Sequence, residues 1–185
     1  MKSKVLPPLV LTVICIVVCG LLVIAHDAAV KDNTGVLTDE MKKGCNEIFG
    51  DGKFEMLTEK KDKKAEPMTF GYKNINSVIT DKQNENCAVE MTCDGYAKGG
   101  LHLLIGIGSD GKIKGMYFLS IGETPGLGAK VAQKEYTDKF TGLSAEDDVE
   151  TVDNLTAATY SSKGLKKACE EVLEFYTVHK REIFA

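Results

Sequence analysis

The sequence predicts an α+β fold, in which an antiparallel sheet meander with flanking helices is preceded by one N-terminal transmembrane helix. Three observations lead to this expectation. Residues 5–25 form a charge-free apolar run, four strand-like runs follow one another between residues 77 and 120, and amphipathic helical patterns stand on both sides of these strands. A chain of 185 residues is long enough for one domain with a hydrophobic core and a small additional element.

The apolar run is long enough to cross a bilayer, because a helix of this length spans roughly 30 Å. Lys2 and Lys4 precede the run, and no cluster of positive charge follows it. The positive-inside rule therefore predicts a cytoplasmic N-terminus. We expect residues 1–30 to be a membrane anchor with a short linker and residues 31–185 to be an extracytoplasmic domain.

A cleaved signal peptide is the alternative interpretation of this run. Such a peptide has a shorter apolar core and a small-x-small cleavage site, whereas the run here ends in Ile-Ala-His-Asp. Cys19 could indicate a lipoprotein, but the two valines before it are too bulky for that signal. A retained anchor is the favoured interpretation.

Composition excludes some classes of protein and leaves the cysteines open. The net charge is −4, so the chain lacks the basic excess typical of nucleic-acid binding. The six cysteines include no C-x-x-C pair, so a zinc or thioredoxin-like centre is not predicted. Cys15 and Cys19 supply only half of a metal ligand set, and Cys87 and Cys93 could pair outside the cell but remain unassigned.

Local patterns predict the elements of the domain in chain order. Thr38 is a candidate N-cap for a short amphipathic helix that ends at Phe49. The charged stretch after it predicts a solvated loop over residues 53–66. Turn-forming residues then separate the four strand-like runs. The expected strands are 77–80, 87–93, 101–108 and 112–120.

Residues 106–111 match the pattern G-x-G-x-x-G, which is also the fingerprint of dinucleotide-binding proteins. The dinucleotide fingerprint must open a helix after its strand. Here Asp110-Gly111 leads directly into another strand-like run. A hairpin turn is therefore predicted.

The second half of the domain is predicted to be mainly helical. We expect a helix over about 129–140, a short strand near 149–152 and a final helix over about 161–180. The last helix has apolar residues at i, i+3, i+4 and i+7, which is typical of a core-facing stripe. A hydroxyl-rich turn over residues 153–162 leads into it.

Two segments could carry chemistry. Thr156, Thr159, Ser161 and Ser162 crowd the start of the last helix, where unpaired N–H groups and the helix dipole favour an anion such as phosphate. Ordinary helix capping explains such residues equally well. The second segment, residues 123–128, is a glycine-rich loop that would let backbone approach a flat ligand, or it is simply a tight loop.

Taken together, the two segments resemble a known family. Glu-Thr-Pro-Gly-Leu-Gly at 123–128, followed by Asp-x-x-Thr-Ala-Ala-Thr-x-Ser-Ser at 153–162, is similar to the FMN-binding domain of redox-driven ion pumps. The chain resembles the G subunit of the Rnf complex and, as a relative, the C subunit of the sodium-pumping NADH:quinone reductase. The resemblance extends over the Gly95-Tyr96…Gly99-Gly100 stretch, the Asp-Gly hairpin and the N-terminal apolar run.

The resemblance implies FMN bound covalently through a phosphoester to Thr159, attached by a separate flavin transferase. It also implies that a set of cofactor-binding residues surrounds the flavin. These residues are Glu123, Thr124, Leu127, Gly128, Thr156, Ala157, Ala158, Ser161 and Ser162. Two departures stand out: the commoner motif has Gly where this chain has Ala157, and a histidine often found shortly before the Glu is absent.

The function implied is that of an electron-transfer subunit in a membrane ion-translocating ferredoxin:NAD oxidoreductase. Its partners would be the flavin and iron–sulfur subunits of such a complex, together with the membrane. Two alternatives keep the flavin: a C-type subunit of the quinone reductase, and a stand-alone anchored flavin carrier. A cofactor-free surface module is the alternative from outside this class.

Overall fold

The computed structural model describes residues 6–29, 36–61 and 64–185, and the chain divides into two compact units, residues 1–33 and 34–185. The first unit contains helix α1, Leu6–Ala29. Within the described part of the chain, no helix has both the length and the apolar character that crossing a membrane requires. Residues 1–5, at the start of the predicted anchor, and residue 30, at the end of the predicted linker, lie outside the described residues.

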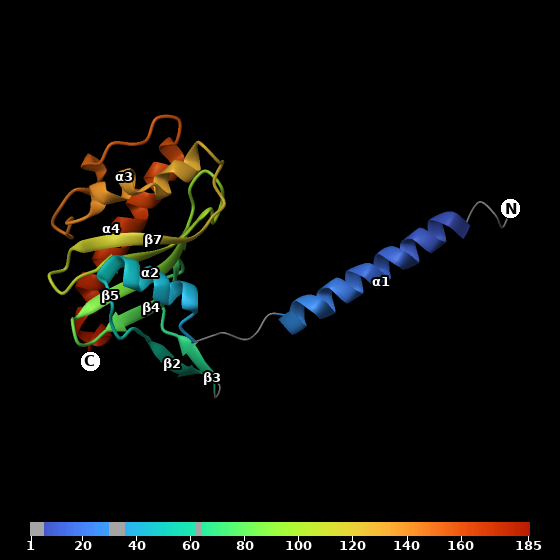
Figure 1. The fold of residues 1–185 in the computed structure, drawn as a ribbon, viewed down its shortest axis with the longest axis horizontal. Coiled ribbons are helices and arrows are strands. Elements are labelled where there is room, and N and C mark those ends of the chain that lie inside the picture. The colour runs from blue at the N-terminus through green and yellow to red at the C-terminus, as the bar shows by residue number, and fades with distance from the viewer. Residues whose placement is uncertain (1–5, 30–35, 62–63) are drawn as a thin grey trace. The chain divides into compact units, whose positions relative to one another are not determined.

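The second unit is built on a five-stranded antiparallel sheet, and the predicted meander is confirmed (Figure 1). Consecutive strands β4 to β7 pair with their neighbours in the sheet, and the short strand β1 pairs with β4. The predicted hairpin at 106–111 joins β6 to β7. The strands are β1 (Glu55–Met56), β4 (Ile75–Asp81), β5 (Asn86–Cys93), β6 (Leu101–Ile107) and β7 (Ile113–Ile121).

The flanking helices cover opposite faces of this sheet (Figure 1). Successive side chains of a strand point to opposite sides, so the sheet has an apolar cluster on each face for a helix to cover. Helix α2, Asp39–Phe49, packs on β6 and β7, and its predicted N-cap Thr38 accepts a hydrogen bond from Met41 N at 3.3 Å. Helix α4, Thr159–Ile183, packs on the other face. The larger apolar core lies between the sheet and α4, and a smaller one lies beneath α2.

The predicted helix over 129–140 is wrong, because three short elements take its place. They are the 3-10 turn η2 (Gly128–Ala132), helix α3 (Lys134–Thr137) and the 3-10 turn η3 (Asp138–Phe140). Gln133 has extended backbone angles, φ −70° and ψ 138°, and these angles interrupt the helix. The apolar spacing still places Val131, Tyr136 and Phe140 in the core.

Two further local predictions are wrong. The strand expected near 149–152 is the 3-10 turn η4, Val149–Thr151, because the Asp148 side chain caps it by accepting a hydrogen bond from Glu150 N at 2.9 Å. The loop expected over 53–66 contains β1 and the hairpin of β2 (Thr58–Lys61) with β3 (Lys64–Pro67). The many charges of this stretch are typical of a solvated loop, so they predicted no strand. Strand β1 forms because it pairs with β4, a segment some twenty residues further along the chain.

The last helix begins two residues earlier than predicted, at Thr159, and ends at Ile183. Cys87 and Cys93 both lie on β5, so their Cα atoms are separated by about 20 Å of extended strand, whereas a disulfide requires less than about 7 Å. Each of the six cysteines in the described part of the chain is free. Pairing of Cys87 with Cys93 within one chain is therefore excluded.

Candidate functional site

A cavity of about 320 Å³ lies where two loops meet the N-terminus of α4. It brings together most of the site residues expected from the two sequence segments, although these segments lie some thirty residues apart. Thr156 and Ser162 are not among the lining residues. The residues that line the cavity are Tyr96, Glu123, Thr124, Leu127, Gly128, Ala157, Ala158, Thr159, Tyr160 and Ser161.

Thr159 is the first residue of α4, and its side chain is exposed at the cavity. Among the residues that the structure describes, none provides a side-chain cap at Ala158, and the first helical turn has no acidic residue. The first N–H groups of a helix have no partners within it, and the dipole of a 25-residue helix adds partial positive charge there. This end of α4 is therefore suited to an anion, with the Thr159 hydroxyl beside it.

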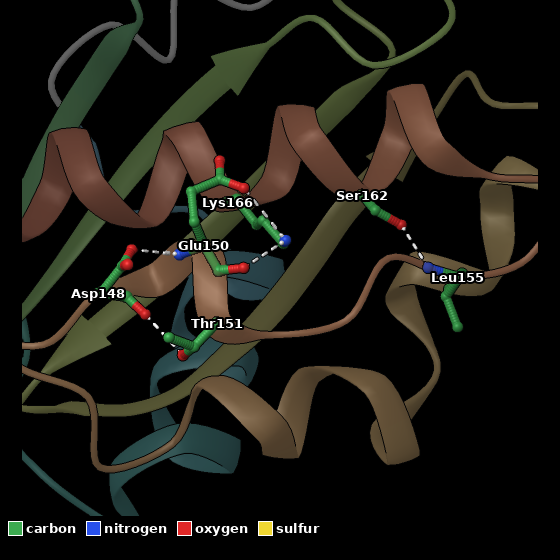
Figure 2. Close-up of polar contacts among 6 residues, drawn as sticks. All are labelled: Asp148, Glu150, Thr151, Leu155, Ser162 and Lys166. Atoms are coloured by element: carbon green, nitrogen blue, oxygen red, sulfur yellow. Dashed lines mark hydrogen bonds and ion pairs between the residues drawn. The ribbon is translucent and has the colours of Figure 1, made fainter.

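The turn before Thr159 has a conformation that is unusual for its residue type. Ala157 has φ 61°, in the left-handed region that a Cβ atom disfavours. Ala158 N donates to Leu155 O at 3.0 Å. Figure 2 shows the second contact, in which Ser162 Oγ accepts a hydrogen bond from Leu155 N at 3.0 Å. Ser162 therefore shapes the turn from behind instead of lining the cavity.

Glu123 is a buried carboxylate that joins three segments of the chain. It is 5% exposed and accepts hydrogen bonds from Tyr96 N at 3.1 Å, from Ala97 N at 3.0 Å and from the Ser161 hydroxyl. An ionised carboxylate only accepts hydrogen bonds, so three donors can share its two oxygens. Glu123 thereby fixes the 94–100 loop, its own loop and the first turn of α4 to one another.

Glycines enclose this carboxylate so closely that side chains would collide with it. A Cβ atom built on Gly95 would lie 2.5 Å from Glu123 Oε1, and one on Gly128 would lie 2.5 Å from both Glu123 Oε2 and Ser161 Oγ. A Cβ atom on Gly100 would also overlap Glu123 Oε1. The glycines are needed here for close packing around one carboxylate.

Exposed apolar side chains form the rim of the cavity. Tyr96 and Tyr160 are 75% and 70% exposed, and their rings meet edge to face with centroids 6.2 Å apart. Leu127 is 46% exposed on the neighbouring loop. Tyr117, by contrast, lies away from this rim, against α2 and beneath Lys43. An apolar rim beside an anion-binding helix end suits a flat aromatic ligand that carries a phosphate.

Sequence reasoning missed the contribution of the 94–100 loop. It supplies two N–H donors to Glu123 and one wall of the cavity through Tyr96. The glycines of this loop were the available signal, since they stood in the stretch covered by the family resemblance. Their purpose becomes visible only when the fold places Glu123 between them.

Residues 95–174 match the model of the FMN-binding domain family. This part of the chain is thus similar to FMN-binding domains, and the resemblance inferred from the sequence is confirmed.

Within this class, the chain is similar to the G subunits of ion-translocating oxidoreductase complexes. The Shewanella oneidensis protein is 34% identical over 104 residues, which are 50% of this chain and 49% of the relative. The G subunit of the proton-translocating ferredoxin:NAD(+) oxidoreductase complex of Clostridium ljungdahlii is 26% identical over 180 residues, covering 90% of this chain and 88% of the relative. The chain spans about half of the length of the first relatives it matches.

A crystal structure of the C subunit of the Na(+)-translocating NADH-quinone reductase from Parabacteroides distasonis is also similar. It is 23% identical, with a TM-score of 0.41, and the match covers 55% of this chain and 59% of that one.

Proposed function

We propose that this chain carries FMN as a phosphoester on Thr159 and acts as an electron-transfer subunit of an Rnf-type membrane complex. One observation carries the proposal. The Thr159 hydroxyl lies at the uncapped N-terminus of a long helix, inside a cavity lined by both segments of the family resemblance. The match to the FMN-binding domain family supports FMN as the ligand.

The residues present fit FMN at both of its ends. The N–H groups at the start of α4 would bind the phosphate oxygens, since no side chain of the described residues caps them. Tyr96, Tyr160 and Leu127 offer apolar surface for the isoalloxazine ring. Bound FMN would supply the redox chemistry, and the protein would supply position and electrostatics.

The role of Glu123 is to build the site. Its two oxygens already accept three hydrogen bonds from protein groups, so it is poorly placed to bind a further donor. It holds Ser161, and therefore the first turn of α4, against the 123–128 loop. Thr124, Leu127 and Gly128 of this loop then line the same cavity as Thr159.

Attachment requires a partner enzyme. A threonine hydroxyl is a weak nucleophile without a base, and the buried carboxylate that lines the same cavity, Glu123, is occupied by Ser161. A flavin transferase that uses FAD would provide the base and the leaving group. The Thr159 oxygen would bond to the FMN phosphorus, the pyrophosphate P–O bond would break, and AMP would leave.

The test is the flavin itself. The protein is purified from a host with an active flavin transferase, denatured in acid and separated on a gel beside Thr159→Ala. Flavin fluorescence in the wild-type band and its loss in the variant are expected, with the FMN mass on the peptide that contains Thr159. Thr177→Ala is the matched control, because Thr177 is a hydroxyl residue on the same helix whose side chain donates to Leu173 O. A dark wild-type band would reject the flavin and leave a cofactor-free surface module.

We further propose that residues 1–30, with their charge-free apolar run, anchor the chain, with the N-terminus in the cytoplasm and residues 31–185 outside. The charge-free run at 5–25 and the two preceding lysines support this orientation. Membrane fractionation followed by protease treatment of intact cells tests it. Recovery of the chain in the soluble fraction, or protection of the FMN domain, would contradict the proposed topology.

In the complex, the flavin would pass electrons between neighbouring flavin and iron–sulfur subunits. The similarity to the sequences of G subunits supports this role over a C-type quinone reductase subunit or a stand-alone carrier. Affinity purification of the tagged full chain from native membranes distinguishes them. Co-purified iron–sulfur and polytopic subunits with ferredoxin:NAD oxidoreductase activity are expected, whereas quinone reductase activity or a lone chain would favour an alternative.

A further inference from the structure

Two side chains on one face of α4 bind the polypeptide that precedes the helix. Ser162 Oγ accepts a hydrogen bond from Leu155 N at 3.0 Å, and Lys166 Nζ donates to Glu150 O at 3.2 Å. Residues four apart on a helix lie one above the other, so both contacts come from the same face. Figure 2 shows the segment from Glu150 to Leu155 running alongside the helix between the two contacts.

Lys166 is unusual because its side chain is 2% exposed. A buried ammonium group loses its hydration, and an apolar residue of similar length would fill the same space at lower cost. Its partners are the Glu150 backbone oxygen and Glu150 Oε2, the latter at 3.3 Å. The Glu150 side chain is 59% exposed, so the carboxylate covers the ammonium group from the solvent side.

The turn that Lys166 binds is itself firmly held. Asp148 Oδ1 accepts a hydrogen bond from Glu150 N at 2.9 Å, and Thr151 Oγ1 donates to Asp148 O at 2.7 Å (Figure 2). Residues 150–158 are thus fixed at Glu150 and at Leu155, and the segment then turns through Ala157 to Thr159. None of the four residues that make these two contacts lines the cavity.

We propose that Lys166 is a positioning residue for flavin attachment. With Ser162, it holds residues 150–158 in one conformation, so that the transferase meets the Thr159 hydroxyl already oriented. Lys166 touches none of the reacting atoms. The inference rests on the proposed attachment of FMN to Thr159, and it adds the element of the fold that prepares the acceptor.

Transfer kinetics test this role, with the full chain in detergent as the acceptor and with the transferase and FAD supplied. Lys166→Met removes the ammonium group and keeps a long side chain. We expect its kcat for flavin transfer to fall roughly 10- to 100-fold, as misplacement of a reacting group typically causes, with an unchanged KM for FAD. Lys166→Arg should recover much of the rate, because it can still donate to Glu150. Lys167→Met, at the exposed neighbouring lysine, is the matched control and should react like wild type.

The outcomes separate the two hypotheses. A flavinylated wild type with an unchanged kcat for Lys166→Met, or an Arg variant no faster than Met, would overturn the positioning role and leave the flavin proposal intact. A wild-type chain that accepts no flavin overturns both. Circular dichroism establishes that each variant is folded. Where Lys166→Met is not, Ser162→Ala decides, because losing the Leu155 contact should also slow transfer and a wild-type rate contradicts the proposal.

Discussion

The Ser161 hydroxyl donates to the Glu123 carboxylate, which links the first turn of α4 to a loop 38 positions earlier in the chain. Ser161 therefore uses its hydroxyl for a tertiary contact and not for capping its own helix. The N-terminus of α4 remains available to a ligand as a consequence. This contact joins the two segments of the family resemblance, residues 123–128 and 153–162. The sequence gives their order along the chain but not their contact in space.

Glu123→Gln should loosen the site more than an exposed substitution does. A glutamine amide offers one accepting oxygen, so at least one of Tyr96 N, Ala97 N and the Ser161 hydroxyl loses its partner in a buried setting. We expect the free energy of unfolding to fall by about 2–3 kcal/mol and the yield of covalent flavin to drop. Urea denaturation and in-gel fluorescence measure the two effects.

The control for this substitution is Glu135→Gln, which makes the same change from carboxylate to amide at an exposed position on α3. It should leave both the stability and the flavin content unchanged. If Glu123→Gln behaves like this control, the carboxylate does not hold the three segments together.

Gly128→Ala should disrupt the same contact from the other side. The added Cβ atom would lie 2.5 Å from both Glu123 Oε2 and Ser161 Oγ, so the hydrogen-bonded pair would have to separate. A loss of about 1–3 kcal/mol in the free energy of unfolding is expected, as is typical of overpacking, together with reduced flavinylation. Thermal melting and flavin fluorescence are the measurements.

Gly115→Ala is the matched control for Gly128→Ala. Its added Cβ atom would meet Ile48 at 3.6 Å, an ordinary van der Waals distance. Equal effects of the two substitutions would show that the packing around Glu123 is not specially tight.

Ala157→Gly should stabilise the attachment turn. An alanine in the left-handed region costs roughly 1–2 kcal/mol, and the greater chain entropy of an unfolded glycine offsets part of the gain. We expect a net rise of up to about 1 kcal/mol in the free energy of unfolding, with covalent flavin retained. Ala158→Gly is the control, because Ala158 has φ −136° and should lose stability instead. A destabilised Ala157→Gly protein would mean that the alanine methyl group makes a compensating contact.

The sequence predicts much of the fold where the decisive interactions are local. Thr38 was expected to cap α2, and its hydroxyl accepts from Met41 N because the capping residue and its partner are three positions apart. The four main strands lie within two residues of their predicted bounds, because turn-formers mark their ends. The helix expected at 129–140 failed at Gln133, whose extended backbone no propensity indicates.

The candidate site divides in the same way. The helix end at Thr159 could be anticipated from clustered hydroxyl residues, but which hydroxyl serves which contact could not. Ser161 bonds to Glu123, and Ser162 bonds to Leu155, although the two residues are adjacent and chemically identical. Their difference arises from the direction in which α4 faces its neighbours, and that direction is a property of the tertiary packing.

The buried thiols predict a specific alkaline instability. Burial raises the pKa of Cys45 to about 12, and burial, with smaller contributions from Glu171, Asp94 and Glu123, raises the pKa of Cys93 to about 12. In the unfolded chain the pKa of these thiols is about 8.5. Because the folded pKa is the higher one, the unfolded state releases protons first, so this contribution to stability is complete below about pH 8.5 and is lost as the pH rises toward 12.

Alkylation by iodoacetamide measures this difference between the folded and unfolded thiols, since the thiolate is the reactive form. In a Cys15→Ser/Cys19→Ser background, only the four buried cysteines remain. At pH 8 we expect them to react much more slowly in the native protein than in urea, and mass spectrometry counts the modified sites. Urea denaturation at pH 7 and pH 10 should show lower stability at pH 10. Rapid native alkylation of Cys93 at pH 8 would contradict the burial of this residue between the sheet and α4.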